Sequence, residues 1–185
     1  RILKDRDILK EIAKTYCAVT FSISTTDEEI ASVVEPNSPS PIKRFEAMRM
    51  LKQIGIISGI IIMPVLPYLS DKAYDIEDIV RKAKAYNADY VIYSPALILK
   101  PNYKDYFINI LKSKYPDIAK LYLDLYNENI IPPDKYTSVV NTQIEIFLQH
   151  YELSSNILQY KKNYDNDTQI DMFGKLHMGD TNNDK

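Results

Sequence analysis

Two apolar runs separated by a helix pattern constrain the fold of this chain more than any other feature of its sequence. The stretch from Val19 to Asp71 reads as a strand, an acidic loop, a capped helix, a glycine and a second strand that ends in a Pro-X-X-Pro turn. A helix between two strands is typical of the right-handed crossover that joins parallel neighbours. The loops that follow such strands gather at one edge of the sheet, where ligands bind. We therefore expect an α/β fold with a ligand site at that edge.

Periodicity and capping residues place the other elements. Helix patterns alternate with short β-branched runs through the first part of the chain. Predicted strands cover residues 17–24, 56–63 and 89–94, and predicted helices cover residues 1–16, 25–33 and 41–54 and a segment that begins near Asp75. The second strand is apolar throughout, which is typical of a strand covered on both faces. Ser40 and Pro41 mark the start of the third helix and Gly55 its end.

Beyond Lys100 the pattern is helical. We expect a helical extension over residues 101–162, whose last helix runs over residues 136–160 after a Pro-Pro break. The first helix of the extension carries an apolar stripe of Tyr103, Tyr106, Phe107, Ile110 and Leu111. Residues 163–185 are polar and are expected to be mostly flexible, with Ile170, Met172 and Phe173 as a short anchored element.

Composition excludes several classes of protein. The chain has 185 residues and a net charge of −2, so no basic excess supports nucleic-acid binding. Its one cysteine, Cys17, excludes an internal disulfide and fits a reducing, cytoplasmic compartment. No apolar run is long enough to span a membrane. His150 and His177 lack partners at metal-ligand spacing, so no metal site is expected. The sequence starts with Arg inside a helix pattern, and we expect an N-terminal portion to precede it.

Candidate binding residues follow the first predicted strand. Ser22 and Ser24 are two residues apart, so both hydroxyls point to the same face near the strand end. They can bind a ribose or a carboxylate, although strand serines more often bond to backbone. Glu35, held by Pro36, can bind a diol or an amino group, or it can be a solvated loop charge.

The third helix and the second strand add further candidates. Lys43 and Arg44 lie in the first turn of a helix, where they can bind an anion, but a solvated helix face is the simpler interpretation. Asp71 is expected to cap the turn that follows. The stiff apolar segment after the second strand can form a wall for a flat ring or serve only as a turn; its members are Met63, Pro64, Val65 and Leu66.

The order and spacing of these pieces resemble the spore photoproduct lyase-like branch of the radical S-adenosylmethionine (SAM) proteins. The pieces are Ser22-Ile23-Ser24-Thr25, Glu35-Pro36, Pro41-X-Lys43-Arg44, Leu51-X-X-X-Gly55-Ile56 and Pro64-X-X-Pro67-X-X-X-Asp71. The opening Lys4-Asp5-Arg6-Asp7-Ile8-Leu9 and the tail Gln169-Ile170-Asp171-Met172-Phe173 are similar to the same branch. It is the order and spacing of the pieces, more than any one of them, that make the resemblance fairly specific.

The resemblance implies part of a (β/α)6 barrel of the TIM type, in which residues 1–100 supply the last three parallel strands. It implies that Ser22 and Ser24 contact the ribose or methionyl part of SAM, Glu35 a polar SAM group and residues 63–66 the adenine. It also implies a [4Fe–4S] cluster on a Cys-X-X-X-Cys-X-X-Cys loop. Those cysteines are absent from this chain. The chain alone is therefore expected to be inactive and to need the missing N-terminal half of the barrel.

Alternatives remain open at this point. A DNA-repair lyase is the best-known member of the branch, but the charge balance gives no support to a nucleic-acid partner. A second interpretation is a non-enzymatic α/β interaction module or scaffold subunit that binds a partner through its tyrosine-rich extension. A hydrolase or aldolase fragment is disfavoured, because no catalytic lysine, glutamate pair or metal set follows the predicted strands.

Overall fold

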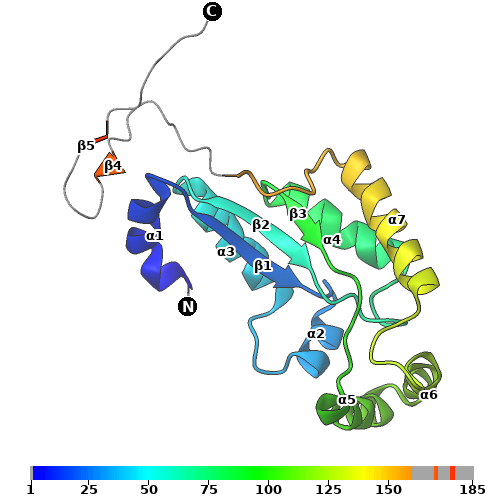
Figure 1. The fold of residues 1–185 in the computed structure, drawn as a ribbon. Helices are drawn as coiled ribbons and strands as arrows, with labels where there is room; N and C mark the ends of the chain where they lie inside the picture. Colours follow the sequence, from blue (N-terminus) through cyan, green and yellow to red (C-terminus); the bar gives the residue numbers. More distant parts are fainter. Residues whose placement is uncertain (1, 160–168, 171–175, 178–185) are drawn as a thin grey trace, which may run out of the picture.

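Three parallel strands form the sheet at the centre of the fold, in the order β1 (Ala18–Ile23), β2 (Ile57–Ile62) and β3 (Val91–Tyr93) (Figure 1). The register pairs Ser22 with Ile61 and Ile61 with Ile92. The computed structural model describes residues 2–159, 169–170 and 176–177. Within these residues the sheet is open and does not close into a barrel. The predicted α/β fold with three parallel strands is confirmed.

Helices precede, connect and follow the strands. They are a 3-10 turn (Ile2–Asp5), α1 (Arg6–Ala13), α2 (Glu28–Val34), α3 (Pro41–Gln53), α4 (Ala73–Ala85), α5 (Pro101–Lys114), α6 (Pro116–Leu125) and α7 (Asp134–His150). The short strands β4 (Gln169–Ile170) and β5 (Leu176–His177) pair antiparallel with each other. Of the predicted anchor in the tail, Ile170 lies in β4, whereas Met172 and Phe173 lie outside the described residues.

Local residues set the start and the end of α3 as predicted. Pro41 is the first helical residue, and Gly55 follows the end of the helix with a positive φ of 86°. For α7 the prediction is wrong, because the helix ends at His150 instead of residue 160. Glu152 has a φ of 51°, and the Leu153 N–H donates to the Leu148 carbonyl, which closes the helix. After this turn the Ser154 carbonyl accepts a hydrogen bond from Val91 in β3.

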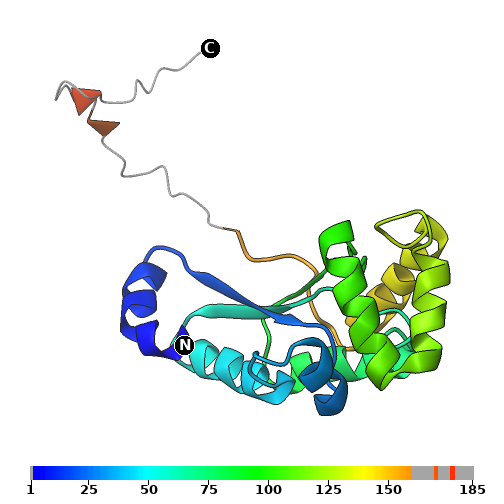
Figure 2. The same cartoon turned by 90° about the horizontal axis from the view of Figure 1, so that it is seen from below.

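One face of the sheet is covered by helices. Alternate residues of β2, Ile60 and Ile62, are fully buried there against α3, α4 and α7. Figure 2 shows α3 and α4 lying on this face. On the opposite face Ile57 and Ile61 are only half-buried. The prediction that β2 is covered on both faces is therefore wrong for the described part of the chain.

Gly59 sits on this second face, beneath Tyr90. The Tyr90 ring lies against the glycine, and its phenol oxygen lies 2.7 Å from Oγ1 of Thr20 in β1. A Cβ atom at position 59 would lie 2.5 Å from the Tyr90 carbonyl oxygen and 2.6 Å from the ring. The close approach of β2 and Tyr90 therefore requires a residue without a side chain.

A second core forms where the extension packs on the loop that follows β2. Leu66 and Leu69 from the loop contact α5 and α6, and the fully buried Tyr122 and Tyr126 lie between them. The apolar stripe predicted for α5 is wrong in part. Tyr103 and Tyr106 are 67% and 66% exposed, and Ile108 is buried with Leu111 instead. The prediction assigned the two tyrosines to the buried face, but a tyrosine is found on exposed faces as well as on buried ones.

The Tyr122 phenol has no hydrogen-bond partner within the described residues, although it is fully buried. Tyr126 lies parallel to it, with ring centroids 5.7 Å apart, and donates to the Leu97 carbonyl at 3.0 Å.

An unsatisfied buried hydroxyl costs about 1–3 kcal/mol. We expect Tyr122→Phe to raise the free energy of unfolding by about 1 kcal/mol and Tyr126→Phe to lower it by a similar amount. Urea denaturation measures both changes. A loss of stability in Tyr122→Phe would show that its hydroxyl has a partner.

Candidate functional site

A cavity of about 550 Å³ lies at the carboxyl ends of β1 and β2. This volume is within the range of small-molecule sites, which is about 300–1,000 Å³. Its walls come from the end of α2, the loop before α3, the segment after β2, Leu97 from the segment between β3 and α5, and Phe107 from α5. The parallel arrangement creates this location, because all three strands end at the same edge of the sheet.

The structure brings together six of the seven residues that the sequence indicates. They are Ser22, Ser24, Glu35, Met63, Pro64 and Leu66, and all of them line the cavity. Val65 does not line it. Its side chain is instead fully buried in the core formed with α3, α4 and α7.

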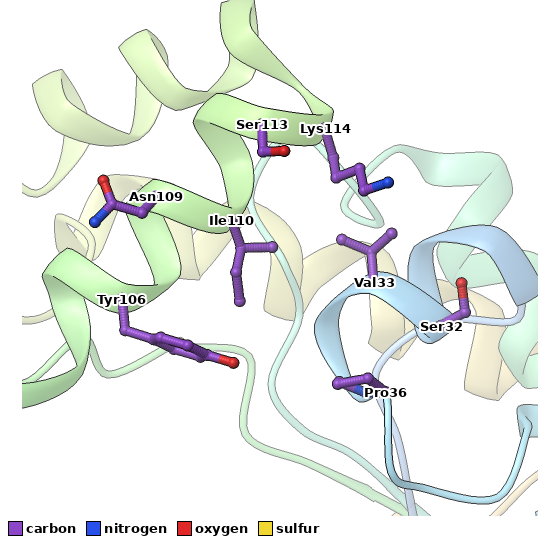
Figure 3. Close-up of a pocket in the computed structure, with 8 residues that line it drawn as sticks. All are labelled: Ser32, Val33, Pro36, Tyr106, Asn109, Ile110, Ser113 and Lys114. Atoms are coloured by element: carbon purple, nitrogen blue, oxygen red, sulfur yellow. The ribbon is translucent and has the colours of Figure 1, made fainter.

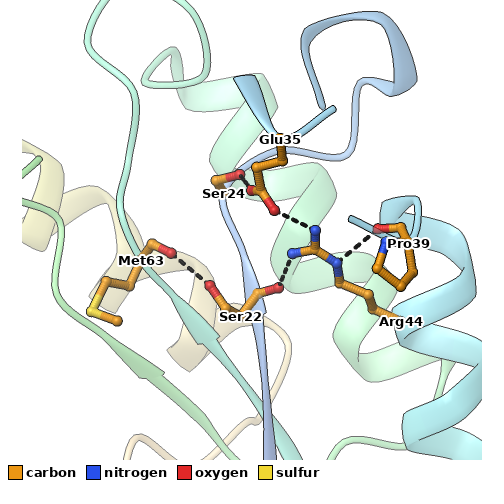
Figure 4. A network of polar contacts seen from close by, with 6 residues as sticks. All are labelled: Ser22, Ser24, Glu35, Pro39, Arg44 and Met63. Atoms are coloured by element: carbon orange, nitrogen blue, oxygen red, sulfur yellow. Dashed lines mark hydrogen bonds and ion pairs between the residues drawn. The ribbon is translucent and has the colours of Figure 1, made fainter. Parts of the chain in front are cut away.

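Arg44 is the centre of a polar network at the cavity (Figure 4). Its guanidinium forms an ion pair with Glu35, donates to the Ser22 carbonyl at 2.8 Å and donates to the Pro39 carbonyl at 2.9 Å. Ser24 donates to the other carboxylate oxygen of Glu35 at 2.5 Å. The Arg44 and Glu35 side chains are only 14% and 27% exposed. The network therefore fixes the loop between α2 and α3 against the end of β1.

Two serines join the ends of β1 and β2. Ser22 donates to the Met63 carbonyl at 2.8 Å, just before the cis Met63–Pro64 peptide bond. Ser70 donates to the Ser24 carbonyl at 2.8 Å and accepts from the Leu66 N–H at 3.2 Å. The segment that follows β2 is thus tied at two points to the end of β1.

Sequence reasoning misses several of these residues. The expectation of a solvated helix face is wrong for Arg44, although a signal is present, because a cation in the first turn of a helix is unfavourable unless an acidic partner lies nearby. The expectation that Asp71 caps the next turn is also wrong. Its carboxylate accepts a hydrogen bond from Tyr136 at 2.9 Å, and α4 starts after Lys72 without a side-chain cap. Nothing in the sequence indicates that Leu97 and Phe107 line the cavity.

The cavity combines charged groups with an apolar wall. Its lining includes the Glu35 carboxylate, the Arg44 guanidinium and three serine hydroxyls, together with the apolar side chains of Met63, Leu66, Leu97 and Phe107. Phe107 packs against Tyr122, with ring centroids 5.6 Å apart. Burial raises the pKa of Tyr122, Tyr126 and Tyr136, so these phenols stay protonated. The arrangement suits a ligand with a flat apolar part and a polar, charged part.

Metal-binding and membrane-spanning features are absent from the part of the chain that the structure describes. No group of three or more His, Cys, Asp or Glu side chains is placed to hold a metal ion there. Cys17 directly precedes β1, at the strand end opposite the cavity. Among the same residues no helix is both long and apolar enough to cross a bilayer.

In its described residues, the chain is thus an α/β protein with an open parallel sheet and a cavity at the carboxyl edge of that sheet. Comparison with known proteins finds relatives that are all uncharacterized. It is 33% identical over 93 residues to the uncharacterized protein ORF301 of Acidianus two-tailed virus, a match that covers 49% of this chain and 31% of the relative. It is 22% identical over 154 residues to the uncharacterized protein Rv2578c of Mycobacterium tuberculosis, covering 83% of this chain and 45% of the relative.

A third relative comes from an archaeon. The chain is 29% identical over 116 residues to the uncharacterized protein MJ0683 of Methanocaldococcus jannaschii, covering 63% of this chain and 41% of the relative. No family model matches the chain, and no solved structure matches it. The chain therefore spans less than half the length of these curated relatives.

Proposed function

We propose that this chain is the C-terminal part of a radical SAM enzyme, similar to the spore photoproduct lyase branch, and that its cavity binds SAM. The observation that carries the proposal is the cavity itself. Six of the seven residues selected by the resemblance line one cavity at the carboxyl edge of a parallel sheet. These residues are up to 44 positions apart, as Ser22 and Leu66 are, and they meet because β1 and β2 end at the same edge of the sheet.

The exposed side of the sheet supports a place in a partial barrel. In the described residues β1 has no strand on its outer edge. Ser22, Ile61 and Ile92 are partly exposed on the face that carries no helices. Ile8 and Ile12 on α1 are 64% and 50% exposed. A preceding set of strands and helices would cover these surfaces, and the helix-free face would then face the barrel interior.

The lining fits SAM by its chemistry. Glu35 can hold the amino group, and Arg44 can hold the carboxylate of the methionyl part. Ser24 and Ser22 can orient the ribose through their hydroxyls, and Met63, Pro64 and Leu66 offer an apolar surface to the adenine. Bound SAM would supply a 5′-deoxyadenosyl radical for hydrogen abstraction, with one electron from the cluster of the N-terminal half breaking its carbon–sulfur bond and releasing methionine. The residues of this chain bind and orient SAM and keep water from the adenine side.

The [4Fe–4S] cluster does not fit this chain. A cluster of this type takes several cysteine thiolates, and the chain has one, at the far end of β1. In our proposal the ligands of the cluster belong to the N-terminal half. Nucleic acid is one candidate substrate of the whole enzyme, but the net charge of −2 on this chain does not favour it.

The test uses the full-length protein that contains this chain. After anaerobic reconstitution with iron and sulfide we expect a broad absorbance near ~400 nm and cleavage of SAM upon reduction. A coding sequence without a Cys-X-X-X-Cys-X-X-Cys motif upstream, or a colourless and inert protein, would contradict the proposal.

The site assignment has its own test in the same protein. We expect Ser24→Ala and Glu35→Ala each to weaken SAM binding roughly tenfold, because each removes a polar contact at the cavity. Glu46→Ala is the matched control, since Glu46 is an exposed carboxylate on α3 that does not line the cavity. Isothermal titration measures the affinities, and circular dichroism checks folding. Unchanged affinity in both cavity variants would refute the site while leaving the fold intact.

A scaffold subunit is the second candidate. The exposed rings of Tyr103 and Tyr106 on α5 favour it, because aromatic side chains are enriched at protein interfaces. The reconstitution experiment separates the two candidates, since a scaffold subunit would neither bind a cluster nor cleave SAM.

A further inference from the structure

A second cavity, of about 570 Å³, lies between α2 and α5 (Figure 3). We call it the α2–α5 groove. α5 lines it with residues 106, 109, 110, 113 and 114, the spacing of one helix face. The other face of α5 carries Ile108 and Leu111 into the core of the extension. α5 therefore has two contact faces, one for the core and one for the groove.

The lining of the groove changes from one end to the other. Figure 3 shows the Tyr106 ring near Pro36 at one end and the Lys114 ammonium at the other. Between them Ile110 of α5 and Val33 of α2 form an apolar floor. A ligand with a ring at one end and a charge at the other would match this sequence of surfaces.

The polar side chains that line the groove differ in their partners: Ser32 of α2 donates to the Glu29 carbonyl at 2.8 Å, whereas those from α5 are available to a ligand. Within the described residues the side chains of Asn109, Ser113 and Lys114 make no hydrogen bond or ion pair. No acidic side chain lines the groove in that part of the chain. By contrast, Lys52 and Lys82 each form an ion pair with an aspartate. Lys114 is therefore the one formal charge among the groove's described lining residues, and it has no ion-pair partner there, which favours an anionic ligand.

We propose that the α2–α5 groove binds a small organic anion with an aromatic body. The ring lies between Tyr106 and the apolar floor, and the anionic group lies at Lys114 with Asn109 and Ser113 as additional donors. The groove is separate from the SAM cavity, because the two differ in every α5 side chain that lines them. They are neighbours, since Phe107 lines the first cavity and the adjacent Tyr106 lines the second. The proposal holds whether or not the first cavity binds SAM.

Two fluorescent probes test the chemistry of the ligand. One is 8-anilinonaphthalene-1-sulfonate, and the other is N-phenyl-1-naphthylamine, which has the same rings without the sulfonate. We expect the sulfonate to bind at least fivefold more tightly to the chain, and we expect added salt to remove most of that difference. Equal affinity for the two probes, or a preference for the neutral probe, would overturn the anion assignment.

Matched variants on α5 test the location. Lys114→Gln should weaken sulfonate binding about fivefold and leave the neutral probe unchanged, whereas Lys112→Gln, on the same helix but outside the groove, should change neither. Tyr106→Ala should weaken both probes about fivefold, whereas Tyr103→Ala, at an equally exposed ring, should not. The groove is refuted if the variants at 106 and 114 behave like their controls at 103 and 112.

Discussion

Gly59→Ala is expected to lower the free energy of unfolding by about 3 kcal/mol. The added methyl group would lie 2.5 Å from the Tyr90 carbonyl oxygen and 2.6 Å from the ring. The carbonyl belongs to the backbone beside β3 and accepts a hydrogen bond from Ile60, so it cannot move without breaking the contact between β2 and β3. Urea denaturation followed by circular dichroism measures the loss.

Gly55→Ala is the matched control for this substitution. Gly55 has a φ of 86°, and a Cβ atom at this position would meet nothing within 4 Å, so alanine there brings backbone strain without a clash. We expect a loss of about 1 kcal/mol. Equal losses at the two positions would show that β2 and Tyr90 can separate at little cost.

Arg44→Met is expected to lower the free energy of unfolding by about 2 kcal/mol. The substitution keeps an unbranched apolar stem but removes the guanidinium, which donates to Glu35 and to two carbonyl groups. The remaining carboxylate is about three-quarters buried and has only Ser24 as a partner. We expect the loop between α2 and α3 to loosen, and SAM binding to weaken with it. Urea denaturation measures the first effect, and isothermal titration of the full-length protein measures the second.

Lys43→Met controls for the loss of a positive charge at the start of α3. Lys43 is exposed, so its replacement should change stability by less than about 0.5 kcal/mol. Pairing Arg44→Met with Glu35→Gln should restore about 1 kcal/mol relative to the sum of the single changes, because the two side chains interact directly. Additive losses would show that Arg44 acts through its backbone contacts alone.

The framework of the fold could be predicted because its signals are local. The caps and breakers around α3, from Pro41 to Gly55, fix the crossover, and the apolar run of β2 fixes the middle strand. Parallel order then follows from the short helical connections. The end of α7 could not be predicted, because the residue in the left-handed conformation after the helix is Glu152 and not the glycine that usually marks a helix end.

The sequence predicts the site residues that adjoin the strand ends. It does not predict those that reach the cavity from distant parts of the sequence. Ser22, Ser24 and Met63 follow directly from the positions of β1 and β2. The exclusion of Val65 follows only from the tertiary packing, which places its side chain in the core instead of the cavity. Phe107 reaches the cavity because α5 folds back over it, and this long-range packing leaves no mark on a single sequence.

Three tyrosines of the helical extension make the stability of the fold sensitive to alkaline pH: Tyr122, Tyr126 and Tyr136. Their phenols keep their protons in the native state at pH values where the same groups ionise in the unfolded chain, since burial raises each native pKa. Unfolding therefore releases protons once the pH exceeds about 10, the value for a free phenol. The stability that these residues provide is complete below that value and declines steadily above it, so strong base should loosen the packing of the helical extension on the loop that follows β2.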